Sequence, residues 1–434
     1  MHSALWFGYE GSARLARLGA SLASLFPLSD AKALRALRAR SGIIDRYRAW
    51  AGAHRDPSRP LLWMHAPSVG EGLQARPVLE LMRQRHPEVQ LAFTHFSPSA
   101  ETFARSLDVD FHDYLPFDSA ADARATLDAL RPTALVYAKL DIWPTLSAVA
   151  HARGIPLGLV SATLAPTSSR RSRLATAVLR DAYVALDGVG AIDDADAARL
   201  IELGVQRSAI TITGDTRYDQ VWQRAQRVDR HSPLLTRLAS SRPTVVAGST
   251  WPADERVLLP AMARVRRRLP AARLIIAPHE PTSAHLASIE EWSAAESYRL
   301  DRLDEGGATT DVILVDRVGV LGDLYALADL AFVGGGFHAA GLHSVLEPAA
   351  FGAPVLFGPR HQGSRDALLL VRDGGARAVG DLASLEQAMA HWIDDRAARV
   401  AAGAKARALV SNGLGAAERS LRVVESLLDG VSEI

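Results

Sequence analysis

Short apolar segments of the strand type alternate with helical segments along almost the whole chain of 434 residues. Early examples are the apolar segments 61–65 and 90–94, which a helical pattern at 73–85 separates. The alternation pauses near residue 225 and starts again at 244–247. Parallel strands need long, usually helical crossovers, so this pattern is typical of sheets covered by helices on both faces. The sequence therefore predicts an α/β protein with two Rossmann-like domains, whose mostly parallel sheets face a central cleft.

The pause in the pattern indicates where one domain ends and the next begins. We assign a basic helical segment to 1–50, a first domain to 51–225 and a second domain to 226–434. The boundary falls in a polar, arginine-rich stretch, as linkers between domains usually do. The last helical patterns, 385–428, belong to the second domain by position, with a return to the first domain as the alternative.

The bulk composition excludes several kinds of chemistry. The sequence has no cysteine, which excludes disulfides, thiolate nucleophiles and zinc held by cysteine. The net charge is +1, so the total charge gives no indication of a nucleic-acid partner. The GxxxxGK[ST] loop, a GxGxxG turn after the first strand, the HExxH metal pattern and the GxSxG nucleophile turn are absent. A two-domain enzyme that binds a sugar nucleotide is the natural candidate.

The first 26 residues form an apolar series interrupted by Glu10, Arg14 and Arg17. No run of about 18 uninterrupted apolar residues occurs, so the sequence encodes no clear transmembrane helix. A cluster of arginines follows this series: Arg35, Arg38, Arg40, Arg46 and Arg48. An apolar helix next to basic residues suits the anionic surface of a membrane, and a helix packed on its own domain is the alternative. We expect membrane association and leave open whether the segment lies on the bilayer or spans it.

A strand, a glycine turn and a helix start follow one another at 330–347. The apolar strand 330–333 is followed by three glycines, Gly334, Gly335 and Gly336. A helical run with Glu347 begins after Ser344. Glycines let the backbone approach a phosphate, and the first N–H groups of a helix attract it. The pattern predicts a nucleotide site in which Glu347 binds the ribose hydroxyls; a plain turn is the alternative.

Polar side chains follow several other predicted strands. They include His65, Glu71, Asp141, Trp251 and His279. Ligands of open parallel sheets bind beyond the carboxyl ends of the strands, so these residues are candidates for one site. For each residue alone, a solvated loop is the alternative.

Five motifs together resemble one known family. They are His65-Ala-Pro-Ser-Val-Gly-Glu71, Leu140-Asp-Ile-Trp-Pro144, Thr213-Gly-Asp-Thr-Arg-Tyr-Asp219, Ala247-Gly-Ser-Thr-Trp251, and the glycine loop with His343-Ser-Val-Leu-Glu-Pro348. They are similar to those of the 3-deoxy-D-manno-oct-2-ulosonic acid (Kdo) transferases of lipid A assembly, from about residue 30 to residue 415. The resemblance implies the GT-B fold, with an acceptor-binding first domain and a second domain that binds the nucleotide sugar.

The resemblance also implies an activity and a place in the cell. It implies inverting transfer of Kdo from CMP-Kdo to a lipid A precursor, lipid IV-A, on the cytoplasmic face of the inner membrane. The protein would be peripheral or anchored by its N-terminal segment, and it would need neither metal nor cofactor. Matching motifs assign the cytidine nucleotide to Pro278, His279, Gly319, Val320, Leu321, Ser344, Val345, Leu346 and Glu347.

The sequence departs from the family at the nucleotide site. The family usually has arginine where His279 stands, and asparagine-proline where Ser344 and Val345 stand. Histidine can still donate to a phosphate, although it is only partly charged at neutral pH. Serine can still cap a helix.

A second departure concerns the general base. The family's glutamate would lie near Ala39, but no carboxylate occurs between Asp30 and Asp45. Inverting transfer needs a group that accepts the proton of the acceptor hydroxyl. We expect Glu71 in this role. The alternatives are an acid from another loop, or a chain that is inactive or uses a different acceptor. A GT-B transferase for another nucleotide sugar and a catalytically impaired CMP-binding homologue are the competing functions.

Overall fold

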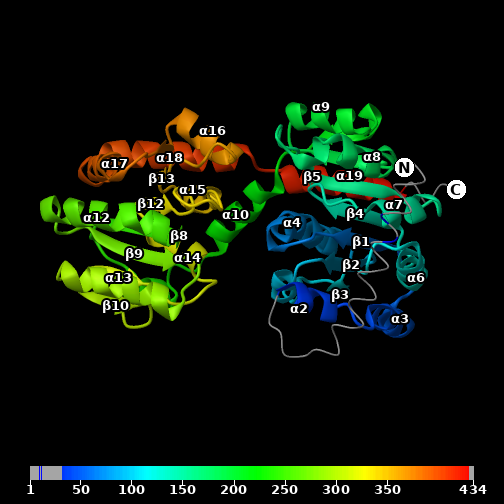
Figure 1. The fold of residues 1–434 in the computed structure, drawn as a ribbon, viewed down its shortest axis with the longest axis horizontal. Helices are drawn as coiled ribbons and strands as arrows, with labels where there is room; N and C mark the ends of the chain where they lie inside the picture. The colour runs from blue at the N-terminus through cyan, green and yellow to red at the C-terminus, as the bar shows by residue number, and fades with distance from the viewer. Residues whose placement is uncertain (1–8, 10, 12–31, 430–434) are drawn as a thin grey trace. The chain divides into compact units, whose positions relative to one another are not determined.

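The computed structural model describes residues 9, 11 and 32–429, and it divides the chain into two compact units (Figure 1). The first unit comprises Met1–Gln220 and Leu414–Ile434, and the second comprises Val221–Gly413. Each unit is an α/β domain with one sheet of seven parallel strands. The division at residue 221 lies close to the boundary near residue 225 that the sequence analysis gives. The helix α10 (Thr216–Arg227) carries the chain from the first unit to the second.

The first sheet has the strand order β3-β2-β1-β4-β5-β6-β7. The strands are β1 (Leu61–His65), β2 (Gln90–His95), β3 (Phe111–Tyr114), β4 (Ala134–Ala138), β5 (Leu157–Ala162), β6 (Gly188–Ala191) and β7 (Ile210–Ile212). The order reverses at β1, which pairs with both β2 and β4. Ligands bind at such a reversal, beyond the carboxyl ends of the two strands.

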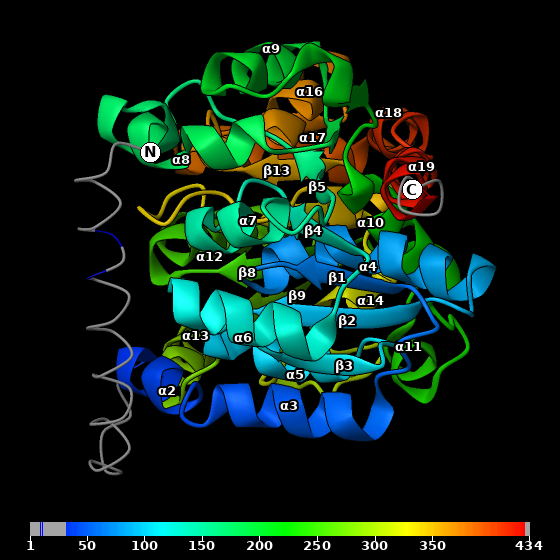
Figure 2. The same cartoon turned by 90° about the vertical axis from the view of Figure 1, so that its right-hand side faces the viewer.

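Alternate residues of β1 enter two different hydrophobic clusters, because its side chains point to the two faces of the sheet. Leu61 and Trp63 belong to the cluster beneath helices α3, α6, α7 and α8, and Leu62 and Met64 belong to the cluster beneath α4 and α19 (Figure 2). The helices of the unit are α2 (Lys32–Arg38), α3 (Ile43–His54), α4 (Val69–Arg85), α5 (Glu101–Arg105), α6 (Ala120–Leu130), α7 (Pro144–His151), α8 (Arg173–Val184), α9 (Asp194–Leu203) and α19 (Ala416–Asp429).

The second sheet repeats this plan, with the order β10-β11-β9-β8-β12-β13-β14 and a reversal at β8. Its strands are β8 (Thr244–Thr250), β9 (Arg273–Pro278), β10 (Leu300–Arg302), β11 (Val312–Leu314), β12 (Leu330–Val333), β13 (Val355–Phe357) and β14 (Ala376–Ala378). Its helices are α11 (Pro233–Leu238), α12 (Pro252–Arg268), α13 (Ser283–Ala295), α14 (Leu321–Leu324), α15 (Leu346–Ala350), α16 (Arg365–Asp373), α17 (Leu382–Asp394) and α18 (Arg396–Asn412). The two parallel sheets confirm the predicted fold class.

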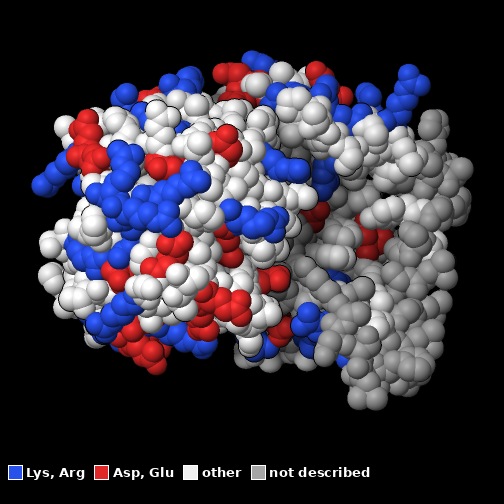
Figure 3. Space-filling view, turned by 60° about the vertical axis from the view of Figure 1, so that its left-hand side comes forward, with Lys and Arg blue, Asp and Glu red and all other residues white. Residues whose placement is uncertain are grey.

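Basic and acidic side chains lie next to one another on the face of the second unit that Figure 3 shows. Ion pairs on the surface of this unit include Arg264–Glu386, Arg267–Glu296 and Arg302–Glu290. Exposed pairs of this kind each contribute little to stability.

The arginine cluster of the N-terminal segment is partly structural. Arg40 is only 3% exposed, and its guanidinium donates to the carbonyl oxygens of Ala36, Phe96 and Leu115. Burial lowers the pKa of this guanidinium to about 10. Arg46 donates two hydrogen bonds to Asp113. The prediction that the five arginines form one surface cluster is therefore wrong for Arg40, which packs inside the unit.

The predicted membrane segment 1–26 lies outside the described residues, except for residues 9 and 11. Among the residues that the structure describes, no helix is both long enough and apolar enough to cross a bilayer.

The last helix, α19, returns to the first unit and completes its core. Leu421, Val424 and Leu427 of α19 lie in the same buried cluster as Leu62 and Met64. The helix approaches the sheet closely because β5 and β6 carry glycine beneath it. A Cβ atom on Gly158 would lie 2.6 Å from Leu427 Cδ1.

We expect Leu427→Ala to lower the free energy of unfolding by about 2–5 kcal/mol, because it leaves a cavity in a closed core. Urea unfolding followed by circular dichroism measures the change. Leu174→Ala is the matched control: Leu174 is 65% exposed, and the change there should stay within about 0.5 kcal/mol. Equal effects of the two substitutions would contradict the assignment of α19 to the core.

Candidate functional site

A buried carboxylate organises the loops at the carboxyl edge of the second sheet. Asp254 is 0% exposed and lies in the first turn of α12, just after β8. Its oxygens accept hydrogen bonds from the backbone N–H groups of Trp251 (2.9 Å), Gly335 (2.7 Å) and Phe337 (2.9 Å). Asp254 therefore connects the start of α12 to the glycine loop after β12. The sequence analysis did not identify it, although a carboxylate three residues after a helix cap is a known signal.

The three glycines of the loop are required by close packing. A Cβ atom would overlap the backbone of Ser249 at Gly334, of Gly341 at Gly335, and of Gly358 at Gly336.

The N–H groups of two of these glycines are already used, because Gly334 donates to Gly248 O (2.9 Å) and Gly335 donates to Asp254. These two amides are not available to a phosphate in this conformation. In this conformation Gly334 and Gly335 serve the packing of the loop, and the predicted nucleotide contact of Gly334, Gly335 and Gly336 stays a prediction.

Free amides occur further along the same loop, before α15. The N–H groups of Ser344 and Val345 donate no hydrogen bond within the part of the chain that the structure describes. Helix α15 begins at Leu346, and Val345 is its N-cap residue, without a side-chain hydrogen bond. The predicted helix cap by the Ser344 hydroxyl is therefore wrong. Consecutive free N–H groups at a helix start are suited to an anion, so the candidate anion position moves from the glycines to Ser344 and Val345.

Glu347 lies on the first turn of α15, and its carboxylate has no hydrogen-bond partner among the described residues. Burial raises the pKa of this carboxylate, and the charge of Arg224 opposes the increase only in part. A partly buried carboxylate without donors is ready to accept hydrogen bonds from a ligand, such as those of ribose hydroxyls.

The loop after β11 leads into the short helix α14, whose Asp323 interacts electrostatically with Glu347. In this loop Gly319 is exposed and has φ +93°, a conformation that favours glycine, and Val320 is the N-cap residue of α14, which begins at Leu321. Arg224 donates to Gly319 O (3.4 Å) and to Asp323 Oδ1 (3.3 Å). The sequence analysis did not identify Arg224, because its contacts span almost 100 positions.

An aromatic stack joins three loops of the same edge. Trp251 Nε1 donates to His343 Nε2 (3.1 Å), so the indole and this imidazole are nearly coplanar, at 11°. The His279 ring lies against both, with centroid distances of 4.6 Å to Trp251 and 4.5 Å to His343. The His338 ring stacks on Trp251 at 4.2 Å. Burial, together with His279, lowers the pKa of His343.

The structure thus gathers the predicted nucleotide residues at one edge of the second sheet. Pro278 ends β9, and His279 follows it with an exposed ring. The ring of His279 contacts that of His343, the residue before Ser344. Three strand ends, those of β9, β11 and β12, therefore contribute to one candidate site.

In the first unit, Glu71 lies in the first turn of α4, after β1. Its carboxylate accepts hydrogen bonds from the Ser68 hydroxyl and from Lys139 Nζ, the latter at 3.2 Å. Partial burial alone would raise the pKa of Glu71, but Ser68 and Lys139 outweigh it and hold this pKa below its ordinary value. Glu71 is therefore ionised at neutral pH and able to accept a proton.

Asp141 is a second candidate acid at the carboxyl edge of the first sheet, after β4. It accepts hydrogen bonds from Trp143 Nε1 (3.1 Å) and Arg170 Nη2 (3.2 Å), and His65 Nε2 lies 3.4 Å away. Burial raises the pKa of Asp141, but His65 and Arg170 lower it below the ordinary value overall. Because three neighbours already occupy its oxygens, Asp141 is less free than Glu71 to receive a proton.

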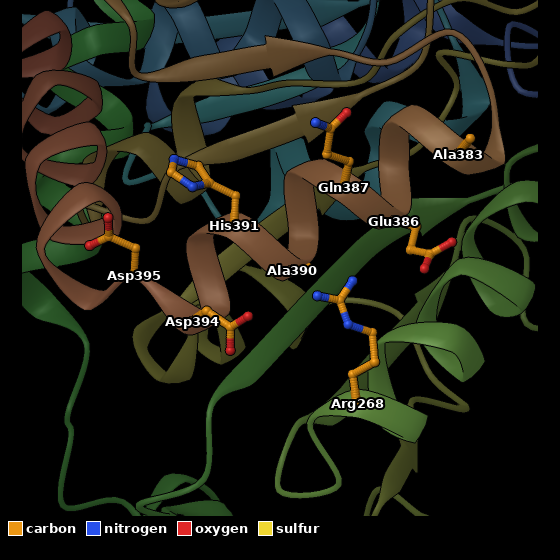
Figure 4. Close-up of a pocket in the computed structure, with 8 residues that line it drawn as sticks. All are labelled: Arg268, Ala383, Glu386, Gln387, Ala390, His391, Asp394 and Asp395. Carbon is orange, nitrogen blue, oxygen red and sulfur yellow. The ribbon is translucent and has the colours of Figure 1, made fainter.

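A polar pocket in the second unit lies away from this edge (Figure 4). Arg268, the last residue of α12, lines this pocket together with Glu386 and His391 of α17. Helix α12 begins at the carboxyl end of β8, so its last residue lies toward the opposite edge of the sheet. We therefore do not include this pocket in the candidate site. Among the described residues, no group of three histidine or acidic side chains is arranged to hold a metal ion.

Comparison with solved structures supports the fold assignment. UDP-GlcNAc 2-epimerase from Neisseria meningitidis, solved with UDP-GlcNAc, superposes with a TM-score of 0.62 at 14% identity, covering 85% of this chain and all of that one. The epimerase from Methanocaldococcus jannaschii gives 0.56 at 13% identity, covering 81% of this chain and 99% of that one. At such identities the likeness concerns the fold. Two Rossmann-like units, with a candidate nucleotide site at the strand ends of the second, define the GT-B class of glycosyltransferase folds.

Sequence comparison identifies the family within that class. Residues 35–220 match the family model of the 3-deoxy-D-manno-octulosonic-acid transferases (kdotransferases). The chain is 30% identical to the 3-deoxy-D-manno-octulosonic acid transferase of Bordetella pertussis, over 88% of this chain and 90% of that protein. Identity to the Haemophilus influenzae enzyme is 26%, over 90% and 92%. The chain belongs to the 3-deoxy-D-manno-octulosonic acid transferase family, which confirms the predicted resemblance.

We expect Asp254→Ala to lower the free energy of unfolding by about 2–4 kcal/mol, because three backbone N–H groups lose their acceptor. Asp254→Asn retains one acceptor oxygen and should lie between the wild type and Asp254→Ala. Urea unfolding measures both, with Asp304→Ala, a substitution at an exposed position, as the control. If Asp254→Ala were as stable as the control, Asp254 would not organise the loop.

Proposed function

We propose that the protein transfers Kdo from CMP-Kdo to a hydroxyl of a lipid A precursor, lipid IV-A. Membership of the Kdo transferase family is the observation that carries this proposal. The free amides of Ser344 and Val345 beside the unpaired carboxylate of Glu347 support it, because together they match a nucleoside monophosphate.

The second unit would hold the donor. In this proposal the N–H groups of Ser344 and Val345 bind the phosphate of CMP-Kdo, and Glu347 accepts hydrogen bonds from the ribose. His279 and the residues at 319–321 lie beside the cytidine. As the sugar leaves, negative charge on the phosphate increases, and fixed backbone donors stabilise that charge without a metal ion.

The first unit would supply the base. The acceptor hydroxyl oxygen forms a bond to the anomeric carbon of Kdo, while the bond from this carbon to the phosphate oxygen breaks. The hydroxyl proton passes to Glu71, and CMP leaves with the electron pair, so the configuration at the anomeric carbon is inverted. Because its pKa is lowered, Glu71 is a weaker base than a carboxylate whose pKa lies near neutrality.

We further propose that the protein works on the cytoplasmic face of the inner membrane. The apolar series at 1–26 and the exposed arginines next to it support this location, because such segments bind anionic bilayers.

A specific observation favours a second candidate, a CMP-binding homologue that does not transfer Kdo. No carboxylate occurs in the sequence between Asp30 and Asp45, where the family has its glutamate, and Glu71 and Asp141 both have lowered pKa values. Such a chain would still bind CMP through the second unit.

One experiment separates these candidates. The protein is incubated with CMP-Kdo and a tetra-acylated lipid A precursor, and the lipid is weighed by mass spectrometry; thermal shift with CMP, UDP and GDP tests the donor in parallel. We expect a Kdo adduct and stabilisation by CMP above the other two nucleotides. CMP binding without an adduct would support the second candidate, and preference for UDP would indicate another nucleotide sugar.

We expect Glu71→Gln to lower kcat by about 10²- to 10⁴-fold without changing CMP binding. Because Glu71 acts when ionised and its pKa is low, activity should fall only below the ordinary glutamate pKa of about 4.3. Lys139→Met removes a cation that lowers this pKa, so the acid limb of the kcat profile should move to higher pH. An unchanged kcat in Glu71→Gln, or an unchanged acid limb in Lys139→Met, would contradict Glu71 as the base.

A further inference from the structure

The guanidinium of Arg224 lies directly on the backbone of Gly322 in α14. A Cβ atom on Gly322 would overlap the Cζ of Arg224, so no larger residue fits there while the arginine keeps its position. Gly322 is not among the residues with positive φ, so its backbone conformation does not require glycine. The glycine at this position is therefore explained by the close approach of Arg224.

Most of the hydrogen-bonding capacity of Arg224 is unused. Among the described residues, only its Nη2 atom donates hydrogen bonds, at 3.4 Å to Gly319 O and 3.3 Å to Asp323 Oδ1, although a guanidinium carries five N–H donors. The Arg224 side chain is 36% exposed and that of Asp323 is 48% exposed, so this ion pair is open to solvent and weak. A ligand can therefore reach the remaining donors.

The surroundings of Arg224 indicate what the ligand is. The guanidinium donates a hydrogen bond to Gly319 O and interacts electrostatically with the carboxylate of Glu347. These are the segments to which the proposed function assigns the cytidine nucleotide. His279 stands where the family has arginine, and burial lowers the pKa of His343.

We propose that Arg224 binds the phosphate of the donor nucleotide together with the amides of Ser344 and Val345, and adds a fixed positive charge to the site. This role rests on the proposed function of the second unit. Arginine forms two parallel hydrogen bonds to a phosphate and stays charged at any physiological pH. Gly322 leaves room for the guanidinium to face the nucleotide, and Asp323 holds the guanidinium there when no ligand is bound.

Calorimetric titration of CMP and of cytidine into the full chain tests this role. We expect Arg224→Met to weaken CMP binding about 10- to 100-fold and cytidine binding less than about threefold, because only CMP carries the phosphate. Arg224→Lys keeps a point charge and should recover part of the loss. Arg264→Met, at an exposed arginine paired with Glu386, is the matched control and should bind both ligands as the wild type does.

A second variant separates binding from folding. Gly322→Ala keeps Arg224 but displaces its guanidinium, so it should weaken CMP binding to a similar degree. Combined with Arg224→Met it should add little, since both changes remove the same contact. The melting temperature without ligand should stay close to that of the wild type in each variant.

Three results would overturn the proposal. Arg224→Met could bind CMP as tightly as the wild type does. It could weaken CMP and cytidine equally, which would mean that Arg224 only positions α14. Additive losses from Arg224→Met and Gly322→Ala would show that the two residues act separately. A wild-type chain that binds neither ligand would refute the proposed donor together with this role.

Discussion

The capture of three backbone N–H groups by the buried carboxylate of Asp254 holds the candidate nucleotide site together. Strands β8 and β12 are neighbours in the sheet, and Asp254 joins the segments that follow them. A charged acceptor makes stronger hydrogen bonds than a neutral one, and all three donors here belong to the main chain. The position of the residues before α15 follows from this bond, because the glycine loop leads directly into them.

Glycine-rich loops often combine close packing with anion binding through free N–H groups. At this edge the two roles belong to different residues. The glycines at 334–336 leave no space for a side chain, and two of their amides are satisfied inside the protein. The free amides lie about ten positions later in the chain, beside Glu347, whose pKa burial raises. Burial disfavours the ionised form of this carboxylate, and this reduces the stability of the unliganded unit. A bound ligand supplies the hydrogen-bond donors that the carboxylate lacks.

The sequence contains enough information for the fold, because alternation of strands and helices is a local pattern. It also places Glu71, His279 and Glu347 correctly after their strands, since a residue just beyond a parallel strand lies at the carboxyl edge whatever the details are. The roles of Asp254, Arg40 and Arg224 depend on contacts between positions far apart in the chain. Composition and spacing do not encode such contacts. The use of the Gly335 N–H group inside the protein was not foreseen for the same reason, because its acceptor, Asp254, is 81 positions away.

The return of α19 to the first unit has a consequence for biosynthesis. The second unit is an insertion between the two parts of the first, so translation finishes Val221–Gly413 before the ribosome has made α19. The apolar residues of β1, β4 and α4 that α19 covers stay open to solvent until α19 has left the ribosome. The second unit can thus fold before the first unit has its last core helix. The nascent protein therefore exposes an unfinished apolar surface that chaperones can recognise.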